Sequence, residues 1–547
     1  MKHIYRFILG GALLTGIFIA GCDTTDLHDM NKNPNAVNQI DVNYFLTAAE
    51  LSASNNGLRD DRYTNWRTNI GFCAHVIQQL ATTASGGIGG VGDKYMENDV
   101  EPSNAPWDHM FAGDGRCTAE IIKQTGPGGY SEGKCINTRN AARILRVLCF
   151  HRLTDWYGSI PYFEANQGIE GIFQPKYDKQ KDIYADLLKE LDEACTALST
   201  SNLDEGFTAA DYYYHGNIAK WKKFGYSLML RLAMRISNKD AATAGTYVTK
   251  AVAGGVMASN DDNCFATMAM GPSEWTNQND ISRGFYPGDG GQWSTSFLSK
   301  FLVDWLMGPD KTTTDDDDPR LMIFTAGIIQ WVAAGDDLSK EVIYLETDPL
   351  KQRGLPNGLD GAMLNTLMGG PTIPYQHFSA VNPYLLRDDE VYQIMNAAES
   401  QFLMAEALER NIGSGITGTA EDHYKLGVKL AMQMYTAYDP KFVISDAQVA
   451  QYLGLYPYGV TKPKLEMIGE QMWACKWMNW WDAWSDFRRT NFPVLIPVNY
   501  PGNATNGTFP GKLLIPAYEA TGNPNYKTGA TMPDRLIGKV WWAGGPE

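Results

Sequence analysis

Aromatic rings set among polar side chains are the residues whose types and spacing could do chemistry in this sequence. They occur in three segments, 273–280, 284–293 and 375–378. A flat ring can stack on the apolar face of a pyranose, while Asn, Gln, Asp and Arg bond the hydroxyls at its edge. The alternative for each ring is that it caps the protein core beneath a long loop. The candidate ligand-binding residues are Trp275, Tyr286, Trp293, Tyr375 and Phe378.

The sequence shows no catalytic constellation. Glycoside hydrolysis needs two carboxylates that face each other across a sugar bond, and the 62 Asp and Glu residues single out no such pair. The motifs G-x-S-x-G and H-E-x-x-H do not occur, and the eight His are scattered. We expect His151 on a helix and His377 in an aromatic loop, both as hydrogen-bonded structural residues. The sequence therefore favours a binding protein with no catalytic residue, no cofactor and no metal over an enzyme.

Two short runs imitate known ligand sites. Gly87–Gly92 matches G-x-G-x-x-G, but a dinucleotide-binding fold needs a strand before this motif, and a helix-like segment precedes it here. We therefore expect a flexible loop. Asp315–Asp318 is followed by Pro319-Arg320, whereas a calcium loop needs liganding oxygens at spaced positions around a Gly turn. A solvated acidic turn is the better interpretation.

The eight cysteines form no C-x-x-C pair and lie at no metal-ligand spacing from a His. Cys149, Cys195 and Cys475 fall in helical patterns, and we expect them to be buried as small apolar residues. Cys117 and Cys135 flank a Gly-rich stretch and could form a disulfide in an oxidising compartment.

The N-terminus has the features of a bacterial lipoprotein signal. Lys2, His3 and Arg6 precede an apolar run too short to span a bilayer, which ends in Ile19-Ala20-Gly21-Cys22. Small residues before a cysteine are similar to the bacterial lipobox, in which the Cys thiol receives a lipid. An ordinary cleaved signal is the alternative. We predict a signal peptide over 1–21, lipidation at Cys22, a flexible tether over 22–39 and a binding domain over 40–547.

Helical hairpins separated by long loops must position the rings. Apolar residues recur at helical spacing over 140–156, 179–198, 218–237, 240–253, 389–411, 420–438 and 464–487. The segments between them, including 84–117, 124–138, 258–296, 308–320, 348–385 and 490–535, have no such period and hold many aromatics. Ala405, Ala407, Gly427 and Ala431 are small enough for two helices to approach closely. The predicted fold class is mainly α, a tetratricopeptide-like scaffold of helical hairpins with long irregular loops.

The charge balance excludes some partners. The 547 residues carry 46 basic and 62 acidic side chains, a net charge of −16, without a basic stripe. This balance argues against nucleic acid and against docking on anionic lipid.

Several segments, in order along nearly the whole chain, resemble the SusD/RagB-like family of nutrient-binding outer-membrane lipoproteins. The most specific is Asp155-Trp156-Tyr157-Gly158-Ser159-Ile160-Pro161-Tyr162, although the family usually has Asp where Ser159 stands. A second departure is Met472, where Lys is common. The other matching segments are 175–194, 220–236, 318–321, 403–407, 470–473, 484–490 and 541–542. From the residues alone, Asp486, Arg488 and Arg489 are expected to tie the last helix to its neighbours.

The resemblance implies a tetratricopeptide-like scaffold, a lipid anchor in the outer membrane facing the cell exterior, and a partner, a SusC/RagA-like TonB-dependent transporter. It transfers no ligand-binding residue, because the family's contacts lie in variable loops. The expected function is capture of oligosaccharides for import. The alternatives are a peptide-binding lipoprotein of the same transport system and a surface glycan hydrolase.

Overall fold

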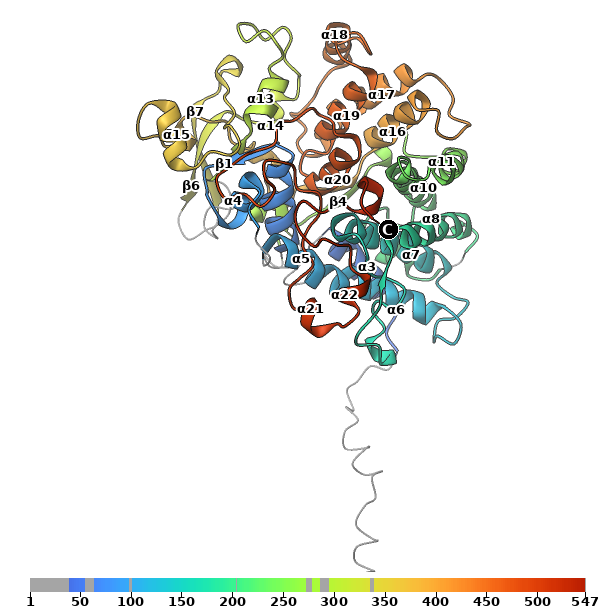
Figure 1. Cartoon of the computed structure of the whole chain (residues 1–547). Coiled ribbons are helices and arrows are strands. Elements are labelled where there is room, and N and C mark those ends of the chain that lie inside the picture. Colours follow the sequence, from blue (N-terminus) through green and yellow to red (C-terminus); the bar gives the residue numbers. More distant parts are fainter. Residues whose placement is uncertain are drawn as a thin grey trace, which may run out of the picture. The chain divides into compact units, whose positions relative to one another are not determined.

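Amphipathic helices that pack in pairs form the main part of this computed structural model. It describes residues 39–54, 63–97, 101–202, 204–271, 278–285, 295–334 and 339–546. The three main pairs are α7 (Ile136–Tyr157) with α8 (Gln180–Ala197), α10 (Ile218–Ile236) with α11 (Ala241–Gly254), and α16 (Ala397–Glu409) with α17 (Ala420–Gln433) (Figure 1). The mainly helical, tetratricopeptide-like fold class is confirmed.

Polar side chains fix where several of these helices begin. The Asn396 side chain accepts a hydrogen bond from the Glu399 amide at 2.9 Å and so caps α16. Thr419 and Asp422 form a capping box at the start of α17, in which each side chain bonds the other residue's backbone amide. Such caps satisfy amides that have no partner within the helix.

Further helices surround these pairs. The remaining α-helices are α3 (Val42–Ala53), α4 (Gly87–Lys94), α5 (Glu101–Met110), α6 (Arg116–Thr125), α9 (Phe207–Ala210), α12 (Asp280–Gly284), α13 (Lys300–Leu306), α14 (Leu321–Phe324), α15 (Gly361–Met368), α18 (Asp446–Leu455), α19 (Lys464–Cys475), α20 (Trp480–Thr490), α21 (Glu519–Gly522) and α22 (Tyr526–Gly529). Within the part of the chain that the structure describes, two segments are π-helical, η1 (Thr64–Ala74) and η2 (Phe111–Gly115). The 3-10 turns are η3 (Gly168–Glu170), η4 (Asn260–Asp262), η7 (Pro349–Lys351), η8 (Pro374–Gln376), η9 (Pro383–Leu385), η10 (Met434–Ala437) and η11 (Trp541–Ala543).

The strands of the described residues form antiparallel two-stranded ladders. β1 (Leu80–Thr82) pairs with β5 (Ser296–Leu298), and β2 (Ile160–Pro161) pairs with β3 (Tyr177–Asp178). The other ladders join β4 (Cys264–Thr267) to β8 (Val391–Met395) and β6 (Ile328–Ala334) to β7 (Ser339–Glu346).

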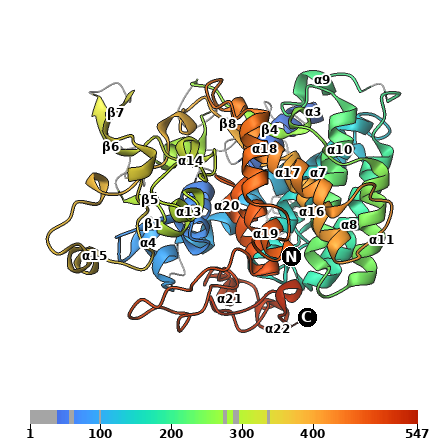
Figure 2. The ribbon, with the colours of Figure 1, turned by 90° about the horizontal axis from the view of Figure 1, so that it is seen from above.

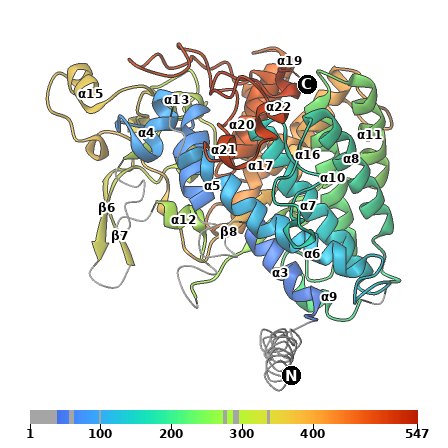
Figure 3. The same ribbon diagram turned by 60° about the horizontal axis from the view of Figure 1, so that its bottom comes forward.

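The helical pairs and the strand-containing part lie on opposite sides of α19 and α20. Figure 2 shows α7, α8, α10 and α11 side by side on one flank and β6, β7 and α15 on the other, and Figure 3 shows the same separation from below. Six of the tryptophans on or beside these helices are almost fully buried: Trp156, Trp473, Trp477, Trp480, Trp481 and Trp484. No helix of the described residues is sufficiently long and apolar to cross a membrane.

The expectation of a flexible loop over Gly87–Gly92 is wrong. Gly87–Lys94 forms the kinked helix α4, which packs on η1. A Cβ added at Gly92 would lie 2.7 Å from the Phe72 Cα atom, so the glycine permits this close contact. The glycine-rich run is therefore a packing motif.

Other predicted boundaries also differ. The expected helix over 464–487 is two helices, α19 and α20, with a break at which Met478 has a φ of 75°. The first part of the expected helix 389–411 is strand β8. The predicted irregular segment 84–117 holds α4, α5 and η2.

Most of the side chains that the sequence predicted to be buried are buried in the structure. Cys149, Cys195 and Cys475 are buried, and His151 lies fully buried on α7, where burial lowers its pKa well below its ordinary value.

The acidic turn over Asp315–Asp318 is solvated only in part, because Asp318 is 2 % exposed. Its carboxylate pairs with Arg320 at 2.7 Å. Cys117 is buried in α6 and Cys135 half-buried before α7, and no disulfide joins these two described residues.

Candidate functional site

The region around α12 is the candidate site, because the segments that carry three of the five predicted rings adjoin this helix in the sequence. Trp275, Tyr286 and Trp293 themselves lie outside the described residues. The residues on either side of them, 278–285 and 295–298, are described. The positions of these three rings therefore stay predictions, and the site is built here from the residues that flank them.

Asn279 fixes α12 onto the entry of strand β8. Its side-chain oxygen accepts from the Ile281 amide at 2.9 Å, and its Nδ2 atom donates to the carbonyls of Glu390 and Val391, both at 3.1 Å. The Ser282 hydroxyl bonds Asp388 Oδ1 at 2.6 Å. Helix α12 is short, so these contacts rather than helix propensity hold it in place.

The opposite side of α12 lies against η1. A Cβ added at Gly284 would lie 2.4 Å from Ile70 Cδ1 and 3.7 Å from Trp66 Cδ1, so a larger residue would push the two elements apart. This contact brings Trp66 next to α12. The π-helical backbone of η1 is unusual, and such segments are frequent at functional sites.

Half-buried rings gather around Trp66. The Tyr63 and Trp66 ring centroids are 5.9 Å apart, and His109 lies 6.4 Å from Tyr63. The Arg67 guanidinium lies over the Tyr63 ring at 4.6 Å. We call Tyr63, Trp66, Arg67 and His109 the ring face.

Two donors of the ring face have no hydrogen-bond partner among the described residues, Trp66 Nε1 and Arg67 Nε. A buried donor without an acceptor costs about 1–3 kcal/mol, so such a group is better satisfied by a ligand or by water. Sequence reasoning missed these residues. The signal was present, since Trp66 stands among Thr64, Asn65 and Arg67 and has the same ring-and-polar composition as the segments that we selected.

Tyr375 and Phe378 lie together in a smaller core cluster, apart from the main core. Phe378 is 2 % exposed, and its ring centroid lies 6.5 Å from that of Phe297 on β5. A ring so deeply buried has no free face for a sugar in this structure. Phe378 therefore lies in the protein core beneath a loop, which was the alternative interpretation of these rings. Tyr375 is half-buried at the edge of the same cluster and keeps part of its ring accessible.

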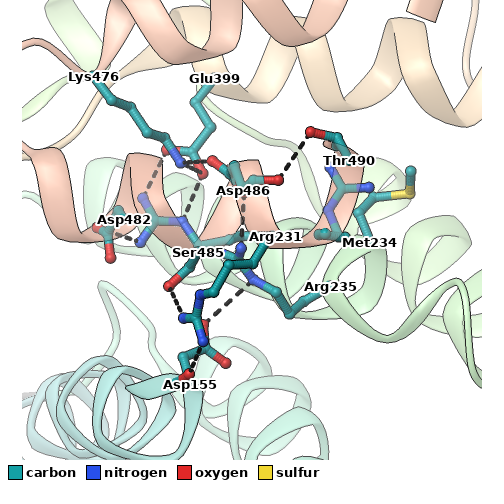
Figure 4. Close-up of polar contacts among 12 residues, drawn as sticks. Asp155, Arg231, Met234, Arg235, Glu399, Lys476, Asp482, Ser485, Asp486 and Thr490 are labelled. Atoms are coloured by element: carbon teal, nitrogen blue, oxygen red, sulfur yellow. Dashed lines mark hydrogen bonds and ion pairs between the residues drawn. The ribbon is translucent and has the colours of Figure 1, made fainter. Parts of the chain in front are cut away.

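A second group of polar residues, the buried ion network, lies between the helices and not at the surface. Its members come from α7, α10, α16, α20 and the segment before α20, and Figure 4 labels Arg231, Glu399, Lys476, Asp482 and Asp486 among them. Arg231 donates to both oxygens of Glu399, at 2.6 and 2.7 Å, and to Asp482 at 3.1 Å. Arg152 pairs with Asp482, also at 3.1 Å. Lys476 bridges Glu399, at 2.9 Å, and Asp486.

Helix α20, which carries Asp486, Arg488 and Arg489, is bound to its neighbours by these residues, as the sequence predicted. Arg235 pairs with Asp486 at 3.0 Å and with Asp155 at 3.4 Å. Arg489 binds both oxygens of Glu406 on α16, the longer contact being 2.6 Å. Arg488 donates to the carbonyls of Asp155 and Gly511, each at 2.8 Å.

These buried carboxylates are committed to structural ion pairs. Burial acts to raise the pKa of Asp482, but Arg152 and Arg231 outweigh it and hold the pKa well below its ordinary value. Burial also acts to raise the pKa of Asp486, but the charges of Lys476 and Arg235 outweigh it and lower this pKa to about 2. An acid that gives up its proton so readily is unsuited to general-acid chemistry near neutral pH. Among the described residues, no group of three or more His, Cys, Asp or Glu could hold a metal ion.

A comparison with protein-family models identifies the family of this chain. Residues 34–516 match the model of a family, SusD-like, whose description is "Starch-binding associating with outer membrane". This protein belongs to the SusD-like family. The resemblance seen in the sequence is thus confirmed.

Solved structures of SusD-like proteins share the fold. A chitin-binding protein is 29 % identical, with a TM-score of 0.74, and the match covers 92 % of this chain and 100 % of that one. A chitin-binding SusD homologue from Flavobacterium johnsoniae is 22 % identical, with a TM-score of 0.70 and coverages of 92 % and 99 %. A SusD homologue from Bacteroides uniformis has 22 % identity, a TM-score of 0.67 and coverages of 91 % and 99 %. No curated protein matches the chain significantly.

The segment that resembles the SusD-like family most closely, 155–162, has a structural role here. Asp155 Oδ1 accepts from Trp542 Nε1 at 2.7 Å and from the Tyr184 hydroxyl. Gly158 ends α7 with a φ of 85°, a conformation that favours glycine, and a Cβ there would lie 2.2 Å from Thr531 Oγ1. The family motif thus joins α7 to α8 and to the C-terminal segment.

Proposed function

We propose that this protein captures oligosaccharides at the outer surface of the outer membrane and passes them to a partner TonB-dependent transporter. Membership of a family described as starch-binding and associated with the outer membrane supports the ligand class and the location. The 29 % identical chitin-binding protein supports a glycan as ligand. A lipid at Cys22 would anchor the protein, since several acyl chains hold a protein stably on a bilayer.

The ring face carries this proposal. Its half-buried rings offer surfaces for stacking on a sugar, and Trp66 Nε1 and Arg67 Nε are buried donors without a partner among the described residues. The segments that adjoin α12 in the sequence add Trp275, Tyr286 and Trp293. These segments have the same combination of aromatic and polar residues. The proposed role is binding without chemistry, and the ion-network carboxylates Asp482 and Asp486, held by cations, are unsuited to act as general acids.

The test is a binding titration of the soluble protein, without residues 1–22, against starch and chitin oligosaccharides and a peptide library. The double variant Trp275→Ala/Trp293→Ala should weaken oligosaccharide binding at least tenfold, which corresponds to about 1.4 kcal/mol. Its melting temperature should stay close to that of the wild type. The matched control is Tyr44→Ala, which removes a 71 % exposed ring from α3. Binding of peptides alone, or equal losses in the control, would contradict the proposal.

A further inference from the structure

A cavity of about 410 Å³ lies between α13, α17, α18 and α19, within the size range of small-ligand pockets. None of its lining residues belongs to the ring face or is one of the five rings predicted from the sequence. Four aromatic residues line it, Trp305, Tyr424, Tyr452 and Tyr456. The cavity is therefore a separate feature of the helical scaffold.

The rings of this cavity are held rigidly. Trp305 meets Trp473 edge to face, with centroids 5.8 Å apart and an interplanar angle of 86°. The Arg320 guanidinium lies 5.4 Å from the Trp305 ring. Tyr424 and Tyr452 are 1 % and 7 % exposed, whereas Trp305 and Tyr456 are only half-buried. The first two form the floor, and the last two offer accessible aromatic surface.

Polar groups of the cavity are fixed by one another. Trp305 Nε1 donates to Glu470 Oε2 at 3.2 Å, and the Lys462 ammonium binds Glu470 Oε1. Gln471 accepts from Arg320 at 2.9 Å and donates to the Tyr452 hydroxyl at 2.8 Å. These contacts hold the side chains in place before any ligand arrives, which lowers the entropy cost of binding.

Hydrogen-bonding capacity remains after these contacts are made. The Tyr452 hydroxyl accepts from Gln471 in a buried contact, and no described residue accepts its own proton, so its capacity to donate is unused. Each Glu470 oxygen has a second lone pair, and the Lys462 ammonium, 40 % exposed, has further N–H groups. The cavity thus offers donors and an acceptor beside aromatic faces.

We propose that this cavity is a second binding site, which takes one neutral pyranose unit. The sugar ring would stack on Trp305 or Tyr456 while its hydroxyls bond Tyr452, Glu470 and Lys462. The carboxylate is already paired with Lys462, so a cationic ligand would gain little there. The site is independent of the ring face and could hold the end of a glycan or a free monosaccharide.

The experiment uses the soluble Trp275→Ala/Trp293→Ala protein, so that the rings of the segments beside α12 contribute little. Glucose, galactose, mannose, xylose and N-acetylglucosamine are screened by saturation-transfer NMR, followed by titration of those that bind. Tyr452→Phe removes only the donating hydroxyl, and Glu470→Gln removes the charged acceptor. Each should weaken binding at least tenfold, with folding checked by thermal melting. The control, Tyr458→Phe, removes a hydroxyl that bonds Glu409 and does not line the cavity.

The outcomes separate the two sites. Binding of a monosaccharide that Tyr452→Phe weakens and Tyr458→Phe preserves supports the cavity site, whatever happens at the ring face. No transfer to any of the five sugars at millimolar concentration would overturn it, and so would binding that both tyrosine variants leave unchanged. A loss of oligosaccharide binding confined to the Trp275→Ala/Trp293→Ala change bears on the proposed function alone.

Discussion

At the scale of single residues, the indole nitrogen of Trp66 is the most specific feature of the ring face. Trp66→Phe keeps a ring next to α12 but removes Nε1, a donor that has no partner among the described residues. We expect oligosaccharide binding to weaken about threefold to tenfold, since a neutral hydrogen bond contributes roughly 0.5–1.5 kcal/mol. Calorimetric titration measures the change.

The same substitution should leave folding intact, because no hydrogen bond within the described structure is lost. A melting temperature within 2 °C or so of the wild type is expected for a change that costs well under 1 kcal/mol. Unchanged affinity in Trp66→Phe would remove this nitrogen from the binding site.

Glu390 should make stability depend on pH. Burial raises its pKa to about 7, although the Val391 amide and Arg387 act in the opposite direction. The folded protein thus keeps a proton between about pH 4.5 and 7 that the unfolded chain has lost. The resulting stabilisation is full below pH 4.5 and is lost as pH rises through 7, by up to about 3 kcal/mol.

The measurement compares Glu390→Gln, which cannot ionise, with the wild type by chemical denaturation at several pH values. The wild type should lose stability relative to the variant as pH rises from 4.5 to 7. Asp389→Asn, at a neighbouring side chain that is 45 % exposed, serves as the comparison and should lower the Glu390 pKa only slightly, because burial is the larger cause of the shift. Parallel curves for the wild type and Glu390→Gln would show that the Glu390 pKa is ordinary.

Single residues also show where prediction from sequence stops. Trp66 could have been chosen by the composition rule that selected Trp275, and Phe378 satisfied the same rule but is buried. Its burial depends on Phe297, which is 81 positions away in the sequence and reaches it through strand β5. Local composition therefore indicates which rings could bind, whereas exposure is decided by distant partners.

At the scale of elements, the helix pair α16 and α17 depends on a small residue, as its sequence suggested. A Cβ added at Gly427 would lie 2.5 Å from the ring of Phe402, which is fully buried. Gly427→Ala should therefore lose about 1–3 kcal/mol of stability through overpacking, despite the better helix propensity of Ala.

Gly454 on α18 provides the matched control, because a Cβ there meets nothing within 4 Å. Gly454→Ala should be neutral or stabilising by up to about 1 kcal/mol. Urea denaturation of the two variants measures both effects. Equal stability changes in the two variants would mean that the contact between α16 and α17 can relax at no cost.

Elements with strong periodicity and caps were predictable, and those shaped by packing were not. Thr419 marks the start of α17 within the sequence itself. The break between α19 and α20, in contrast, serves Lys476, which is fully buried between Glu399 and Asp486. Nothing in the periodicity of 464–487 records these partners. The glycines of α4 were wrongly predicted to form a loop for the same reason, because their role is to permit close contact with η1.

At the scale of the whole molecule, the proposed function requires attachment to the outer membrane. Cys22→Ser should move the protein from the membrane fraction to the soluble fraction, because the lipid attachment site is lost. Detergent phase partitioning of cells that express each form measures this. Ala substitution of Cys135, a cysteine far from the N-terminus, serves as the control. Retention of Cys22→Ser in the detergent phase would refute the anchor.

The buried ion network also dictates the order in which the chain can fold. Arg152 and Arg231 find their shared partner Asp482 only 330 and 251 residues later. Until the chain has been synthesised to that point, Arg152 and Arg231 would lie among the first helical pairs without this shared counter-charge, at a cost of several kcal/mol each. The early helices must therefore wait, partly solvated, for the final fifth of the polypeptide. A product truncated before Asp482 should therefore be more susceptible to proteolysis than the whole chain.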